Sequence, residues 1–180
     1  MVEFTKNNIK TGAGTEDGVV VGPVQNKMQF DKVKDMYGQV EKQKWKPALT
    51  GSITSSTNGY FITPAITDNP PEGSRILQEE PFGPIVPLLK WSDKDNVIDR
   101  ANALKTGLGA SVWRKGLIRA EAMAWRLEAG NVWVNSHSDV DAGVPFEGWK
   151  ESGVGMEWGM EGLKSYTNSR NLWIWKKIFE

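Results

Sequence analysis

The feature that most constrains the fold is an alternation of short β-favouring runs and amphipathic helical stretches along the chain. "IVPLLKW" and "LGASVWR" are apolar runs bounded by Gly or Pro, and a helical pattern with Val97, Ile98 and Ala101 on one face lies between them. A second helical stretch over 117–129 then leads to the strand-like "NVWVN". This order is typical of α/β folds, in which right-handed crossovers join parallel strands. We therefore predict an open, mostly parallel sheet with flanking helices.

The segments on either side of this alternation differ in composition. Residues 1–23 are polar and punctuated by glycine, which predicts a loose lead-in. From residue 24 to 167 we expect one domain, which begins with a helical pattern that includes Val33 and Met36. Residues 168–180 contain "NLWIWKK", an apolar run that favours a C-terminal strand. Within the domain, Ser92 and Asp95 form a capping-box pattern at the start of the helix that carries Val97, Ile98 and Ala101.

Charge and cysteine content exclude several classes of protein. The 22 basic and 22 acidic residues give a formal net charge of zero, which argues against a nucleic-acid-binding surface. No apolar run approaches the ~20 residues that a membrane helix needs, so we expect no membrane contact and a cytoplasmic protein. With no cysteine and one histidine, the sequence offers no disulfide, no cysteine nucleophile and no structural zinc site.

Several separated motifs give the sequence a family resemblance. They are "GYFITPAI", "ILQEEPFGPIVPLLKW", "GLGASVW", "LEAGNVWVN", "PFEGWKESGVG" and the closing "GLKSYTNSRNLWIWKK". Their order and spacing resemble the C-terminal catalytic region of the NAD(P)-dependent aldehyde dehydrogenases. The resemblance implies that family's open α/β catalytic domain and a terminal oligomerisation strand. It also implies that Glu80 matches the glutamate that binds the nicotinamide ribose, and Phe82 the phenylalanine beside the nicotinamide. Phe146 matches an aromatic of the aldehyde tunnel, and Val140 lies at the mouth of that tunnel.

The departures from the family pattern restrict the chemistry. The family's nucleophile is a cysteine, and this sequence has none. Its general base, its oxyanion-hole asparagine and its cofactor domain all lie upstream of the matched region. Covalent catalysis needs the thiolate and the oxyanion donors. We therefore expect no aldehyde oxidation and no cofactor, with Glu80 and Phe82 as remnants of a cofactor site; local pairing and core packing are the alternative for them.

The loop "NSHSDVDAGVPFEGW" carries the most reactive side chains of the sequence. Histidine side chains are common acids and bases near neutral pH, and a neighbouring carboxylate could orient His137 for acid/base catalysis. The candidate carboxylates are Asp139, Asp141 and Glu147, the last at a position where the family usually has glycine. The alternative is a solvated polar loop. A triad of Ser136, His137 and Asp139 is rejected, because near-adjacent residues rarely converge in that geometry.

Trp149 and Trp158 flank this loop, and they either wall a pocket for a flat apolar ligand or pack in the core. The leading hypothesis is a truncated family member that performs a cofactor-free cyclisation, isomerisation or dehydration on a small molecule of secondary metabolism. One alternative is a non-catalytic partner of a full-length relative, and another is an inactive fragment of a dehydrogenase. We also expect a homodimer formed through the C-terminal strand.

Overall fold

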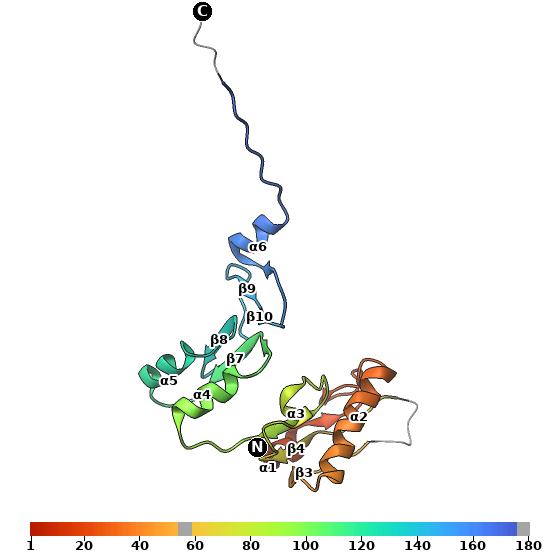
Figure 1. The fold of residues 1–180 in the computed structure, drawn as a ribbon. Helices are drawn as coiled ribbons and strands as arrows, with labels where there is room; N and C mark the ends of the chain where they lie inside the picture. Colours follow the sequence, from red (N-terminus) through yellow and green to blue (C-terminus); the bar gives the residue numbers. More distant parts are fainter. Residues whose placement is uncertain (54–58, 176–180) are drawn as a thin grey trace, which may run out of the picture. The chain divides into compact units, whose positions relative to one another are not determined.

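The computed structural model describes residues 1–53 and 59–175. The chain divides into two compact units, Met1–Lys90 and Trp91–Glu180 (Figure 1). This division falls inside the stretch 24–167, for which the sequence analysis predicted a single domain. In the described ranges, no helix has both the length and the apolar composition that a membrane crossing requires.

The first unit is built around the long helix α2 (Lys27–Lys42). The Asn26 side chain caps this helix by accepting a hydrogen bond from the Gln29 backbone N–H at 2.9 Å. Val33 and Met36, three residues apart on the apolar face of the helix, are fully buried. Met36 packs with Ala65 and Ile85, whereas Val33 packs in a second cluster with buried apolar residues outside the strands. The helix predicted from the apolar spacing is confirmed.

A three-stranded sheet lies against α2 in this unit (Figure 1). β4 is the central strand, antiparallel to β3 and parallel to β5. The short helix α3 precedes β5 in the sequence, and its residue Ile76 joins Met36 in the core together with Ala65 and Ile85. The bounds of these elements are β3 (Pro47–Leu49), β4 (Ala65–Asp68), α3 (Arg75–Gln78) and β5 (Ile85–Leu88).

The first 23 residues, expected to be a loose lead-in, contain regular structure. Helix α1 (Val2–Asn8) is followed by two short strands, β1 (Lys10–Thr11) and β2 (Val19–Val21), which pair in parallel. Glu16 tightens the turn between them, because its carboxylate accepts a hydrogen bond from the Ala13 backbone N–H and lies 3.3 Å from the Lys10 ammonium. None of the residues of α1 is buried.

The second unit contains the predicted strand–helix–strand alternation. β7 and β8 are parallel, with Ser111 opposite Trp133, and α5 packs against both. Asp93 caps α4 by accepting from the Asp95 N–H, so the predicted cap at Ser92 is one residue too early. The predicted helix over 117–129 ends at Ala124. The bounds are α4 (Lys94–Asn102), β7 (Gly109–Val112), α5 (Leu117–Ala124) and β8 (Asn131–Val134).

Very short ladders complete the second unit. β6 (Thr106–Gly107) pairs with β10 (Trp149–Lys150), and β9 (Phe146–Glu147) pairs with β11 (Met156–Glu157), both antiparallel. Helix α6 (Gly159–Ser165) follows β11. The predicted α/β class is confirmed, but the parallel pairs β4–β5 and β7–β8 belong to separate small sheets.

The C-terminal segment does not form a strand in the described residues. Residues 168–175 have no regular secondary structure, and 176–180 lie outside the described residues. Leu172, Trp173, Ile174 and Trp175 are between 75% and 92% exposed. The predicted C-terminal strand therefore has no pairing partner within the described chain.

Candidate functional site

The segment Glu80–Phe82, between α3 and β5, is the first candidate site. Phe82 has a φ of 45°, in the left-handed region that large side chains avoid, yet the residue is 72% exposed. Such a conformation costs about 1–3 kcal/mol, and it persists only where the surrounding structure holds it. Glu80 is also exposed, and no residue in the described ranges forms a hydrogen bond or ion pair with its carboxylate. An exposed ring and an unpaired carboxylate in a strained turn are typical of ligand contacts rather than of core packing.

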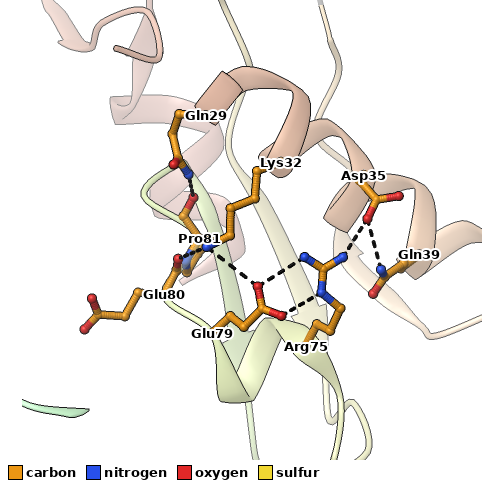
Figure 2. Close-up of polar contacts among 8 residues, drawn as sticks. All are labelled: Gln29, Lys32, Asp35, Gln39, Arg75, Glu79, Glu80 and Pro81. Carbon is orange, nitrogen blue, oxygen red and sulfur yellow. Dashed lines mark hydrogen bonds and ion pairs between the residues drawn. The ribbon is translucent and has the colours of Figure 1, made fainter. Parts of the chain in front are cut away.

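Helix α2 holds the backbone of this segment from one side (Figure 2). The Gln29 side-chain amide donates to the Pro81 carbonyl at 2.6 Å, and the Lys32 ammonium donates to the Glu80 carbonyl at 3.2 Å. Gly83 passes so close to the helix that a Cβ there would lie 2.6 Å from Val33 Cγ2. In Figure 2 the Glu80 carboxylate points away from α2. The helix thus fixes the backbone and leaves the Glu80 side chain available.

A cavity of about 210 Å³ in the second unit is the other candidate site. It lies where β8, β9 and the loop between them meet the start of α6. The Phe146 and Trp158 rings form one wall in an edge-to-face contact, with centroids 5.5 Å apart. Asp139, Val140 and Asp141 line the same cavity. The structure therefore brings these predicted site residues together around one small, partly apolar space.

The polar groups of this cavity are partly engaged in holding its loop. The Asp141 carboxylate accepts from the Gly143 backbone N–H at 2.7 Å, and the Asp139 backbone carbonyl accepts from the Trp133 indole at 2.8 Å. Asn131, which was not among the predicted site residues, lines the cavity and donates to the Glu147 carbonyl at 3.1 Å. A polar residue at the start of the apolar run "NVWV" was the available signal for it.

His137 lies outside the cavity and has other partners. Its Nδ1 is 2.6 Å from Ser111 Oγ, and its ring packs edge-on against Trp133 at a centroid distance of 5.2 Å. In the described part of the chain, no hydrogen bond or ion pair joins His137 to Asp139 or Asp141. Ser111 was not selected from the sequence, because its place opposite Trp133 depends on the register of β7 and β8.

Glu147 and Trp149 are also absent from the cavity lining. Glu147 lies on β9, opposite Met156 of β11. Trp149 lies on β10, opposite Gly107 of β6. Neither side chain supplies a functional group to the space between Phe146 and Trp158.

Comparisons with known proteins agree on one family. The model of the aldehyde dehydrogenase family matches residues 1–172. The putative aldehyde dehydrogenase DhaS of Bacillus subtilis is 36% identical over 167 residues, which cover 93% of this chain and 34% of that protein. The phenylacetaldehyde dehydrogenase of Pseudomonas fluorescens is 36% identical over 168 residues, with the same coverage of each protein. The NAD⁺ complex of an aldehyde dehydrogenase from Bacillus cereus has a TM-score of 0.87 and 35% identity, covering 96% of this chain and 35% of that one. The chain spans about a third of the length of these relatives.

Proposed function

The chain belongs to the aldehyde dehydrogenase family, and from that premise we propose that these 180 residues supply cofactor and substrate contacts to an NAD(P)-dependent aldehyde-oxidising site without oxidising aldehydes by themselves. Glu80 would hold the nicotinamide ribose, and Phe82 would pack beside the nicotinamide. Val140, Phe146 and Trp158 would form part of the wall that contacts the aldehyde.

The observation that carries the proposal is the geometry of Glu80–Phe82. The carboxylate can accept hydrogen bonds from two ribose hydroxyls, and the exposed ring offers a flat apolar face to an aromatic heterocycle. These two residues would hold the nicotinamide end of the cofactor, which would supply the hydride acceptor for aldehyde oxidation. The strained φ of Phe82 is consistent with a residue held in place for a ligand.

The composition limits what the chain does alone. Oxidation through a covalent thiohemiacetal requires a cysteine thiolate, and the sequence contains no cysteine. The nucleophile must therefore come from polypeptide outside these 180 residues. The chain spans only about a third of the length of its relatives, and this coverage supports a contribution to a larger active site.

The cofactor-free acid/base chemistry predicted from the sequence has weaker support. It needs a histidine oriented by a carboxylate, and the partners of His137 are Ser111 and Trp133. The Asp141 carboxylate that lines the cavity already accepts a backbone N–H in its own turn. Part of its capacity as a base is therefore occupied by a structural contact.

The test exchanges the matching third of the Bacillus cereus enzyme for this chain and measures NADH formation with an aldehyde and NAD⁺. We expect the chimera to form NADH and the isolated 180-residue protein to form none above background. In the chimera, Glu80→Gln should raise KM for NAD⁺ by about ten- to a hundredfold, because a charge-assisted hydrogen bond is worth about 1.5–3 kcal/mol. Glu41→Gln, an exposed change on α2, is the matched control.

Two results would count against the proposal. One is NADH formation by the isolated chain at a rate comparable with that of the chimera. The other is a chimera that melts cooperatively yet neither binds NAD⁺ nor responds to Glu80→Gln.

A further inference from the structure

Arg75, the first residue of α3, is the centre of an ion-pair network beside the Glu80–Phe82 segment (Figure 2). Its Nε and Nη2 donate to the two carboxylate oxygens of Glu79 at 2.8 and 3.1 Å. Its Nη1 donates to Asp35 Oδ2 on α2 at 2.6 Å, and that oxygen also accepts from the Gln39 amide at 3.2 Å. The guanidinium therefore ties the end of α3 to the middle of α2. The two-pronged contact with Glu79 is one that a lysine cannot reproduce.

Glu79 connects the Arg75 contacts to the backbone of the Glu80–Phe82 segment, which follows it in the sequence. It is the residue at which α3 ends, with an extended backbone, so the position of its side chain helps to set where the chain leaves the helix. The hydrogen bonds from Arg75 hold the pKa of Glu79 below its usual value, so the carboxylate stays charged and paired. Lys32 lies 3.6 Å from Glu79 Oε2 and donates to the Glu80 carbonyl. The same lysine thus contacts two consecutive residues.

All of the α2 side chains in this network lie on one face of the helix. Their spacing of three or four residues brings them into register with the Glu79–Pro81 backbone. They are Gln29, Lys32, Asp35 and Gln39. The ion pairs are substantially exposed, so their value for stability is small. Their geometry, however, restrains the Glu80–Phe82 segment. Among the described residues of this unit, it is the only segment that combines a strained aromatic residue with an exposed carboxylate.

We propose that Arg75 is a positioning residue for the cofactor contacts. It does not touch the cofactor; through Glu79 and Asp35 it fixes the backbone from which Glu80 and Phe82 project. This inference rests on the proposed function for the role of those two side chains. The restraint of the Glu80–Phe82 backbone by Arg75 can be measured in the 180-residue protein alone, without the cofactor or the chimera.

The first measurement is backbone order in the intact 180-residue protein by ¹⁵N relaxation. In the unmodified protein we expect Glu80, Phe82 and Gly83 to be rigid, with order parameters of about 0.85, and in Arg75→Met to fall below about 0.6. Arg75→Lys should restore little of the order, because it lacks the planar fork. Asp35→Asn, which keeps Arg75 and Glu79 together, should lower the order by less. It serves as the second variant if Arg75→Met does not fold.

Lys27→Met is the matched control for these variants, because it removes another ion pair of α2, the one between Lys27 and Asp31 at 2.5 Å. We expect it to leave Glu80–Gly83 unchanged. Unchanged order parameters in both Arg75→Met and Asp35→Asn would overturn the inference.

The second measurement uses the chimera described above. Arg75→Met should raise KM for NAD⁺ by about tenfold while kcat changes less than twofold, and it should add little to Glu80→Gln, because residues that act through one another are not additive. An unchanged KM in an active chimera would overturn the inference even if the segment becomes mobile. An inactive chimera would count against the proposed function alone, and the order parameters would then decide whether Arg75 positions the segment.

Discussion

At the scale of single residues, Gly38 within α2 and Gly83 beside it differ in the space available for a side chain. A Cβ at Gly38, inside the helix, would meet no atom within 4 Å, whereas a Cβ at Gly83 would lie 2.6 Å from Val33 Cγ2. Gly38→Ala should raise the free energy of unfolding by about 0.5–1 kcal/mol, because alanine loses less conformational entropy in a helix. Gly83→Ala should lower it by about 1–3 kcal/mol, because Val33 is fully buried and has little room to move.

Urea unfolding followed by tryptophan fluorescence measures both changes on the same scale. Equal midpoints for Gly83→Ala and the unmodified protein would mean that the segment can move away from α2. That result would also weaken the case that the helix fixes the Phe82 backbone.

The charge of Glu79 gives a pH-dependent prediction. Hydrogen bonds from Arg75 lower its pKa in the folded protein below the ordinary value of 4.5. A depressed carboxyl pKa contributes stability that is present above 4.5 and is lost as the pH falls through the folded-state pKa. The difference in stability between the unmodified protein and Glu79→Gln should therefore be largest near neutrality and should shrink in acid. Thermal melts of both proteins from neutral to acidic pH test this. A stability difference that grows on acidification would contradict the contact between Arg75 and Glu79.

At the scale of elements, Tyr37 connects α2 to the loops beside β4 and β5. Its hydroxyl lies 2.7 Å from the Thr63 carbonyl and 3.0 Å from the Pro84 carbonyl, and it can donate a hydrogen bond to either oxygen. Burial raises the pKa of Tyr37, so the group remains a neutral donor. Tyr37→Phe should lower the free energy of unfolding by about 0.5–1.5 kcal/mol, the net value of one hydrogen bond.

Tyr60→Phe is the control for this prediction, because Tyr60 is exposed and its ring makes a tilted contact with Phe30. Removing its hydroxyl should change stability by less than about 0.5 kcal/mol. Equal effects of the two substitutions in chemical unfolding would mean that the Tyr37 contacts do not anchor the helix.

The sequence predicted those elements whose signal is local. Helix α2 and the alternation of β5, α4, β7, α5 and β8 follow from apolar spacing and from Gly and Pro boundaries, and they are confirmed. The pairs β6–β10 and β9–β11 are two residues long and join distant segments, so no local period marks them. The same limit applies to the contact between Ser111 and His137, which depends on strand register. Val140, Phe146 and Trp158 were selected through the family resemblance and through composition, and they do line one cavity.

At the scale of the whole molecule, the exposed C-terminal segment is the feature that most needs a partner. Leu172, Trp173, Ile174 and Trp175 are largely exposed, although contiguous apolar side chains are costly in water. The zero formal net charge offers little repulsion between copies of the chain. Both features favour association over a free monomer.

We predict a homodimer in which this segment of each subunit contacts the other subunit. Trp173 and Trp175 would bury roughly 150–250 Å² each, enough at about 25 cal/mol per Å² to supply several kcal/mol per subunit towards the cost of association. A twofold arrangement pairs both segments and leaves no free apolar end from which a filament could grow. Light scattering at micromolar concentration should give a dimer for the intact protein and a monomer for a chain ending at Thr167. A monomeric intact protein, or a dimer that survives the truncation, would show that the segment folds against its own chain or is not needed for assembly.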